Sequence, residues 1–200
     1  MTLKDIIVET QVNLRADAAN AMAVFSVDSQ QVENLRSEAR IRQFSLTVDE
    51  PPTLGGSDAG PNPVELILAG LATCQEITYR AYATALGVPL DSVSVKLEGV
   101  LDLRGFFAVD ERVRAGFTGV RGTVTLKSSA SKEELAKLKE VVDAHCPVLD
   151  ILALPFRWNS SLPPCRSPSR PKFPSGSGRP AKSWPSLSPH RLSNPVQCFG

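Results

Sequence analysis

Apolar and polar residues alternate early in the chain, as they do in strands. Phe44, Leu46 and Val48 alternate with the polar residues of segment 43–48. A period of two places every second side chain on one face of a strand, so we expect this face to be buried. Residues 22–38 are interpreted as a preceding hairpin. The chain is therefore predicted to begin with strands.

A long helix is predicted from about Pro63 to Leu86. It follows the loop LGGSDAGPNP, carries a proline in its first turn and is closed by Gly87. Its first half reads VELILAGLATC, which is apolar nearly all round. A helix of this kind lies inside the molecule or in a subunit interface. We therefore expect the helix, and Cys74 in its middle, to be buried.

Two half-buried strands are predicted after the long helix. The first has one apolar face, made by Val93, Val95, Leu97, Leu101 and Leu103. The second has an apolar face made by Val120, Val124 and Leu126. A helix then begins at Ser131, with Glu134 completing a capping box, and ends near His145, before a short apolar helix opened by Cys146-Pro147. Strands, a central helix, more strands and final helices predict the α+β class.

The composition changes abruptly at residue 155. Residues 155–200 contain ten of the sixteen prolines, seven of the 22 basic residues and no acidic residue. This composition favours a solvated, disordered tail, with a tether for anions as the alternative. Residues 1–154 are taken as the globular domain. So sharp a change also suggests a frame-shifted or read-through end, a hypothesis that the genomic reading frame can test.

The globular part is acidic. Residues 1–154 hold 15 basic and 21 acidic residues, a formal charge of −6, and no basic stripe, which argues against nucleic-acid binding. The N-terminus has no basic leader and no segment is long enough to span a membrane, so neither export nor membrane insertion is expected. We expect a cytoplasmic protein whose two globular cysteines are thiols rather than a disulfide framework.

Cys146 is a candidate reactive thiol because it lies at the predicted start of the short helix. Free backbone N–H groups and the helix dipole favour a thiolate there and lower its pKa. The alternative is a small buried side chain that precedes a proline. Cys74 lies in the middle of its helix, where the dipole gives no help. It is interpreted as a core residue unless the fold brings a cation and a carboxylate to it.

Glu65 is the candidate carboxylate. It lies nine positions before Cys74 on the same helix, roughly 13 Å along the axis. Taken alone, it is also a first-turn acid that complements the helix dipole. A zinc site formed by Cys74, His145 and Cys146 is an alternative interpretation. Three ligands without a paired spacing make a weak signature, however, so no metal is expected.

Three motifs resemble the OsmC/Ohr superfamily in their order and spacing. They are LGGSDAGPNPVELILAGLATC, EGVLDLRGFF and HCPVLDIL, within about residues 20–152. The combination of an NP-x-E-L helix start, a mid-helix cysteine and a later CPV motif carries the resemblance. The stretches DEPPTLGG and DLRGF resemble the OsmC-like branch more than the typical Ohr enzymes.

This resemblance implies an OsmC-like fold, with an antiparallel sheet, a long buried central helix and an intertwined homodimer whose active sites form between the subunits. It implies an antioxidant peroxidase that reduces organic or lipid hydroperoxides in an oxidative stress response. Cys74 would be the peroxidatic cysteine that becomes a sulfenic acid, and Cys146 the resolving cysteine that closes an intramolecular disulfide. An external dithiol would reduce that disulfide, and no bound cofactor is implied.

The chain departs from the family pattern at the residues that stabilise the peroxidatic thiolate. Typical peroxidases pair an arginine with a glutamate ten positions before the cysteine, where this chain has Val64. Glu65, displaced by about 100° around the helix, is the substitute, as in some OsmC-like relatives. Arg42 and Arg104 are the candidate cations by position, with solvated strand residues as the alternative reading.

Two other functions on the same fold stay open. One is a non-enzymatic binding protein for a hydrophobic small molecule, in which the cysteines merely pack. The other is a redox sensor that forms the Cys74–Cys146 disulfide and passes the signal to a partner. The apolar surroundings expected for both thiols suit a bulky organic hydroperoxide better than hydrogen peroxide.

Overall fold

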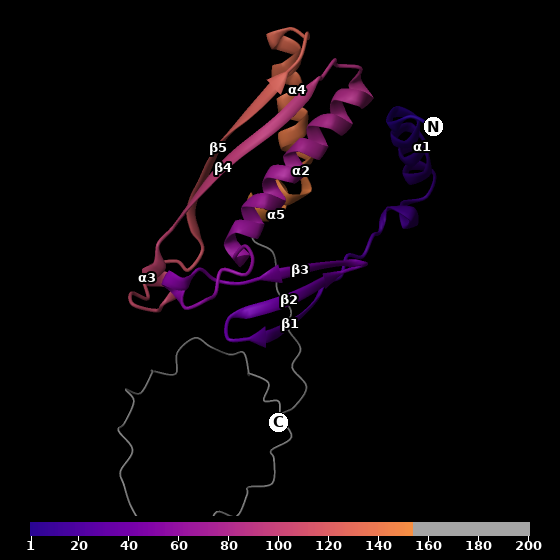
Figure 1. The fold of residues 1–200 in the computed structure, drawn as a ribbon. Coiled ribbons are helices and arrows are strands. Elements are labelled where there is room, and N and C mark those ends of the chain that lie inside the picture. The colour runs from indigo at the N-terminus through magenta and orange to yellow at the C-terminus, as the bar shows by residue number, and fades with distance from the viewer. Residues whose placement is uncertain (154–200) are drawn as a thin grey trace, which may run out of the picture. The chain divides into compact units, whose positions relative to one another are not determined.

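The computed structural model describes residues 1–153, so the predicted tail and the predicted domain boundary at residue 154 lie outside the described residues. The elements follow one another as α1 (Leu3–Ala16), β1 (Asp28–Glu33), β2 (Arg36–Ile41), β3 (Phe44–Val48), α2 (Pro63–Leu86), β4 (Ser92–Leu101), α3 (Leu103–Phe106), β5 (Phe117–Lys127), α4 (Lys132–His145) and α5 (Pro147–Ala153) (Figure 1). Helices and antiparallel strands together give the predicted α+β class.

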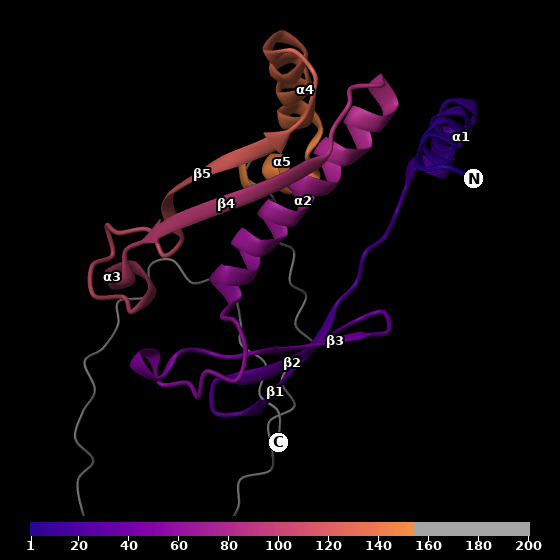
Figure 2. The same ribbon diagram turned by 45° about the horizontal axis from the view of Figure 1, so that its top comes forward.

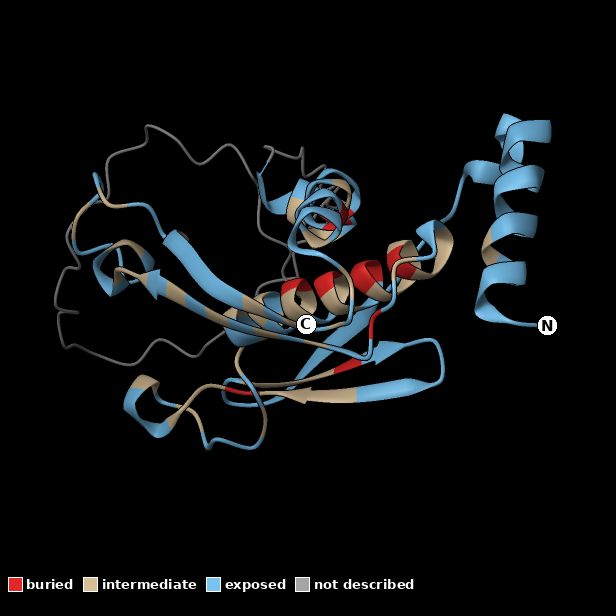
Figure 3. Cartoon of the chain, turned by 90° about the horizontal axis from the view of Figure 1, so that it is seen from above, coloured by how far each residue is buried: buried red, intermediate tan, exposed pale blue. Residues whose placement is uncertain are grey.

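Helix α1 was not predicted, and the expectation that the chain begins with strands is wrong. A capping box starts the helix, because Thr2 Oγ1 accepts the N–H of Asp5 and the Asp5 carboxylate accepts the N–H of Thr2. The helix packs against α2 and leaves nearly all its side chains exposed (Figure 3). The polar residues mixed into its apolar positions hid the helical period in the sequence.

Strands β1, β2 and β3 form an antiparallel meander (Figures 1 and 2). The predicted hairpin is confirmed, although its first strand begins at Asp28 rather than near residue 22. The buried face predicted for β3 is wrong, since Phe44 is 53% exposed and Leu46 is only half-buried. Among the helices and strands of residues 1–153, these strands pack mainly against one another, so that face is only partly covered.

The loop between β3 and α2 is organised by the buried carboxylate of Asp49. It accepts hydrogen bonds from the Ser57 hydroxyl at 2.6 Å, the Ser57 N–H at 3.0 Å and the Ala59 N–H at 3.2 Å. The Ser57 hydroxyl and these N–H groups lower the pKa of Asp49 to about 2. The ionised carboxylate therefore holds the loop that leads into α2.

Helix α2 begins and ends where the sequence predicts. Asn62 Oδ1 accepts the N–H of Glu65 and the Glu65 carboxylate accepts the N–H of Asn62, a capping box at the helix start. Pro63 occupies the first turn, where no N–H is needed. Gly87 ends the helix in the left-handed region, at φ 73°, which costs a glycine little.

Strands β4 and β5 form an antiparallel hairpin that lies along α2 (Figures 1 and 2). The predicted alternation of β4 is confirmed, because its apolar positions are half-buried and the residues between them are exposed. Leu103 was wrongly assigned to this strand. The Asp102 carboxylate accepts the N–H of Arg104 and starts the short helix α3 at that position.

The core forms between α2, α4 and the hairpin. Its buried side chains are Tyr79, Ala83, Leu90, Leu138 and Val142. The predicted capping box of α4 is confirmed, with Ser131 Oγ accepting the N–H of Glu134. Within residues 1–153, no helix is both long enough and apolar enough to cross a membrane.

The first half of α2 is less buried than its composition suggests. Between Pro63 and Cys74 only Leu71 is buried, and Cys74 itself is half-buried. Within one chain, therefore, the helix is not buried along its length and Cys74 is half-buried, while its burial in a subunit interface stays a prediction. The reason is that the core is built around Tyr79 and Ala83, which lie in the second half of the helix.

Candidate functional site

The structure brings together the two cysteines singled out in the sequence. Cys74 comes from the middle of α2, and Cys146 from the junction of α4 and α5, 72 residues later. The Cys146 thiol donates a hydrogen bond to the Cys74 sulfur, with 3.3 Å between the two Sγ atoms. Both are free thiols, since a disulfide needs about 2.05 Å between its sulfurs. The two sulfurs are therefore in contact but unbonded.

The backbone around the pair is well supported. Cys146 ends α4 in an extended conformation, and its carbonyl accepts the N–H of Asp150 at 3.0 Å in the first turn of α5. On α2, the Thr78 hydroxyl donates to the carbonyl of Cys74 at 2.7 Å. Helix α2 packs against both α4 and α5. Three helices therefore position the two sulfurs.

The two thiols differ in exposure. Cys146 is 1% exposed, whereas Cys74 is half-buried. Cys74 is therefore the more accessible residue of the pair.

The lowered pKa predicted for Cys146 is wrong, because its pKa is raised. Burial is the largest cause, and the neighbouring Cys74 adds to it. The N–H of Leu149, at the start of α5, does act to lower the pKa of Cys146, as the sequence predicts for a helix start. Burial raises this pKa by more. The Gln75 side chain acts in the same direction as the Leu149 N–H. Cys146 is therefore held as a thiol while Cys74 is reduced.

Gln75 is the site residue that the sequence analysis missed. Its side chain is buried beside Cys74, in the helix turn that faces Cys146. The signal available in the sequence was a glutamine directly after the cysteine, at the end of an apolar stretch. Its amide N–H can donate to the Cys146 sulfur, which acts to lower the pKa of Cys146.

An open groove of about 560 Å³ lies between α2, the hairpin and α4. The two cysteines do not line it, but Gln75 and Leu149, which contact Cys146, do. Its floor is largely apolar, made by Leu71, Val95, Leu97, Val124, Leu126 and Leu135. The charged groups at its edge include the ion pair of Lys139 and Asp143. Such a lining suits an apolar ligand with a polar end.

Glu65 and Val64 lie at the start of α2. The Glu65 side chain is exposed, and its carboxylate is engaged by the Asn62 N–H at 2.9 Å. Val64 is half-buried and lines a second cavity, of about 440 Å³, beside the first half of α2. Among residues 1–153, Glu65 forms no ion pair with an arginine. Its observed contact is the helix cap.

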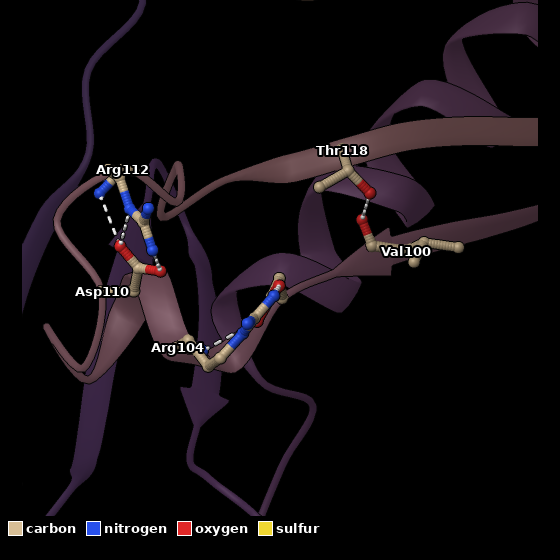
Figure 4. Close-up of polar contacts among 6 residues, drawn as sticks. Val100, Arg104, Asp110, Arg112 and Thr118 are labelled. Carbon is tan, nitrogen blue, oxygen red and sulfur yellow. Dashed lines mark hydrogen bonds and ion pairs between the residues drawn. The ribbon is translucent and has the colours of Figure 1, made fainter.

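The candidate arginines are engaged elsewhere. Arg104 lies at the β4–β5 tip (Figure 4), where its guanidinium binds the Asp102 carboxylate and lowers the pKa of that carboxyl. Arg42 occupies a left-handed turn, at φ 58°, with its guanidinium 5.3 Å from the centre of the Phe44 ring. In the described part of one chain, neither arginine hydrogen-bonds to Cys74 or Cys146.

His145, the third member of the zinc alternative, stacks on the Tyr82 ring with 5.3 Å between ring centres. Over residues 1–153, no three His, Cys, Asp or Glu side chains gather in a group that could hold a metal ion.

Comparisons with known proteins agree with this architecture. The chain is 26% identical over 106 residues to the uncharacterized protein YmaD of Bacillus subtilis (strain 168), which covers 51% of this chain and 67% of that protein. The fold resembles the crystal structure of an OsmC-like protein from Mycoplasma pneumoniae, with a TM-score of 0.57 and 20% identity over 66% of this chain and 88% of that one.

A second similar structure comes from Legionella pneumophila. It is described as an organic hydroperoxide resistance protein OsmC and predicted redox protein, and it matches with a TM-score of 0.51 and 23% identity over 66% of this chain and 91% of that one. The family model described as OsmC-like protein matches residues 55–160, which include Cys74 and Cys146. Since this match spans more than half of the sequence, the chain belongs to the OsmC-like protein family.

Proposed function

We propose that this chain is a thiol-dependent peroxidase that reduces organic hydroperoxides, with Cys74 as the peroxidatic cysteine and Cys146 as the resolving cysteine. The observation that carries the proposal is the 3.3 Å between the Sγ atoms of two cysteines 72 residues apart. Membership of the OsmC-like family supports it. So does the description of the Legionella relative as an organic hydroperoxide resistance protein.

The exposure of the thiols supports this division of roles. The half-buried Cys74 is open to a peroxide, and its thiolate attacks the terminal oxygen to give a sulfenic acid and an alcohol. The buried Cys146 lies within reach of that sulfenic acid and is shielded from direct oxidation. Their disulfide is then reduced by an external dithiol through thiol exchange.

The apolar groove supports an organic substrate. Its floor accommodates an alkyl, aryl or lipid hydroperoxide, whereas hydrogen peroxide gains nothing from apolar contacts. We therefore propose a preference for bulky hydroperoxides.

We also propose that the active form is a homodimer. The first half of α2 is apolar but half-exposed within one chain, and exposed apolar surface of this kind is typical of an interface. A second subunit would bring to Cys74 the cation that residues 1–153 of one chain do not place there. Glu65 would orient that cation, with Arg42 or Arg104 as the candidates.

The test is peroxide consumption in the presence of dithiothreitol, with cumene hydroperoxide and hydrogen peroxide compared. Wild type is compared with Cys74→Ser and Cys146→Ser, and with Cys165→Ser as a control that removes a cysteine outside the described residues. We expect no turnover after Cys74→Ser and strongly reduced turnover after Cys146→Ser. The control should match the wild type.

Other outcomes identify the rival functions. No turnover by the wild type, with both thiols persistently reduced, would favour a binding protein for a hydrophobic molecule. One stoichiometric oxidation without cycling would favour a redox sensor.

A further inference from the structure

The two sulfurs lie 3.3 Å apart, within hydrogen-bond distance. Because burial raises the pKa of Cys146, the proton of a singly ionised pair stays on Cys146, which then donates to the Cys74 sulfur. In the described part of the chain, no other hydrogen bond to the Cys74 sulfur is made by a side chain. A sulfur that accepts an S–H group is stabilised in its charged form, because a hydrogen bond to a charged acceptor is stronger than one to a neutral acceptor.

We propose that Cys146 acts before it resolves, as the proton donor that stabilises the Cys74 thiolate and then supplies a proton to the first product. The proposal rests on the proposed peroxidase function and deepens it. It gives the resolving cysteine a second role, that of a general acid.

The electrons and protons balance as follows. The Cys74 thiolate attacks the terminal oxygen of the hydroperoxide, so an S–O bond forms, the O–O bond breaks, and an alkoxide leaves. The sulfur is oxidised by two electrons and the peroxide is reduced. The alkoxide takes the Cys146 proton and becomes the alcohol. The resulting Cys146 thiolate attacks the Cys74 sulfenic acid, which forms the S–S bond and releases hydroxide.

The surroundings of Cys146 favour this order of events. While Cys74 is a thiolate, its charge and its hydrogen bond help to keep the pKa of Cys146 raised. A neutral sulfenic acid on Cys74 removes that charge, whereas the Leu149 N–H and the Gln75 side chain remain. Cys146 therefore becomes easier to deprotonate once Cys74 is oxidised.

Other ionisable groups lie on the three helices that meet at the pair. They are Glu65, Glu76, Tyr79, Arg80 and Tyr82 on α2, Lys132, Glu133, Glu134, Lys137, Lys139, Glu140, Asp143 and His145 on α4, and Asp150 on α5. The charge that acts on the Cys146 thiol is that of Cys74.

The test measures the pKa of Cys74 in two matched variants of the full chain, Cys146→Ala and Cys146→Ser. Cys165 and Cys198 are replaced by serine throughout, so that Cys74 is the one remaining cysteine and its ultraviolet thiolate absorbance can be titrated. Serine keeps a donor at the position and alanine removes it. We expect Cys74 to form its thiolate less readily in the alanine variant than in the serine variant, as loss of a hydrogen bond to a charged group implies.

The same pair tests the first chemical step. Single-turnover formation of the Cys74 sulfenic acid, trapped with dimedone, should be about tenfold slower near pH 7 in the alanine variant than in the serine variant. Val142→Ala, made in the Cys146→Ser background so that no second thiol consumes the sulfenic acid, opens a cavity in the same helix and keeps a donor. It should lower the melting temperature and leave sulfenic acid formation unchanged.

A further variant tests whether Cys146 becomes easier to deprotonate when Cys74 carries no charge. Cys74→Ser replaces the thiolate by a neutral hydroxyl, and the lone Cys146 should then titrate at a lower pH than the second thiol of the unsubstituted pair. An equal or higher value would overturn this part of the inference.

These measurements separate the inference from the proposed function. Equal Cys74 pKa values in the alanine and serine variants would overturn the donor role even if the wild type reduces peroxides. A wild type that consumes no peroxide would overturn the peroxidase proposal, while a raised pKa in the alanine variant would still establish the hydrogen bond.

Discussion

The two halves of α2 belong to one helix and have different environments. The first half, 63–74, is the more continuously apolar in sequence, yet Leu71 is its one buried residue within a chain. The second half, 75–86, includes Gln75, Glu76 and Arg80, and it supplies the buried Tyr79 and Ala83 of the core. The more apolar half of the helix is therefore not the more buried half.

The difference teaches that burial depends on which elements pack against a segment. The second half is covered by α4 and the hairpin, whose apolar positions match its Tyr79 and Ala83. The first half has no comparable cover within residues 1–153. Cys74 lies at the boundary, which leaves its sulfur half-buried while Cys146 is fully enclosed.

The largest effect on folding is expected from the core half of the helix. Tyr79 is 1% exposed, so Tyr79→Ala should destabilise the chain by about 3–5 kcal/mol through the lost burial and the cavity left behind. Ile67, on the same helix, is 41% exposed, and Ile67→Ala should cost about 1 kcal/mol or less within a monomer. Urea unfolding of both variants measures the contrast. Similar losses for the two would mean that the first half is as well covered as the second.

Charge on the exposed half tests the proposed dimer. Ile67→Asp would place a carboxylate in an apolar contact between subunits and should weaken dimerisation by about 2 kcal/mol, roughly thirtyfold in the dissociation constant. Sedimentation equilibrium of wild type and variant measures this change. An unchanged association constant would place the interface elsewhere, and a monomeric wild type would contradict the dimer itself.

A smaller, pH-dependent effect is expected where the chain enters α2. The pKa of Asp49 is lowered from 3.8 to about 2, so its ionised form stabilises the folded loop fully above about pH 4. This contribution is lost as the pH falls from about 4 towards 2. Asp49→Asn should therefore reduce stability most at pH values above 4, with a difference from wild type that shrinks on acidification. A difference independent of pH would mean that the carboxylate charge is not what holds the loop.

The smallest effect on stability is expected at Glu65. Glu65→Ala removes the acceptor for the Asn62 N–H and should cost about 0.5–1 kcal/mol, whereas Glu65→Gln keeps an acceptor and should cost less. The same two variants test the proposed role of the charge, because glutamine cannot orient a cation as a carboxylate does. Peroxide turnover reduced in Glu65→Gln at unchanged stability would support that role. Unchanged turnover would leave Glu65 as a helix cap.

Local signals in the sequence were sufficient for much of the fold. Asn62, Pro63 and Gly87 delimit α2, and Ser131 with Glu134 starts α4, because capping depends on residues within a few positions of one another. Alternation in β4 likewise predicted its half-buried face. The error at Leu103 arose because Asp102 caps a new turn, which period-two counting does not detect.

The sequence by itself determined the limits of α2 and α4, the β4 alternation and the two cysteines that carry the candidate chemistry. Only the tertiary structure decided that Cys74 and Cys146 lie 3.3 Å apart, that burial raises the pKa of Cys146, and that Gln75 lies beside it. The physical reason is range. Capping and strand period act over neighbouring residues, whereas the distance between α2 and the α4–α5 junction, and the desolvation of a sulfur there, depend on how distant segments pack together.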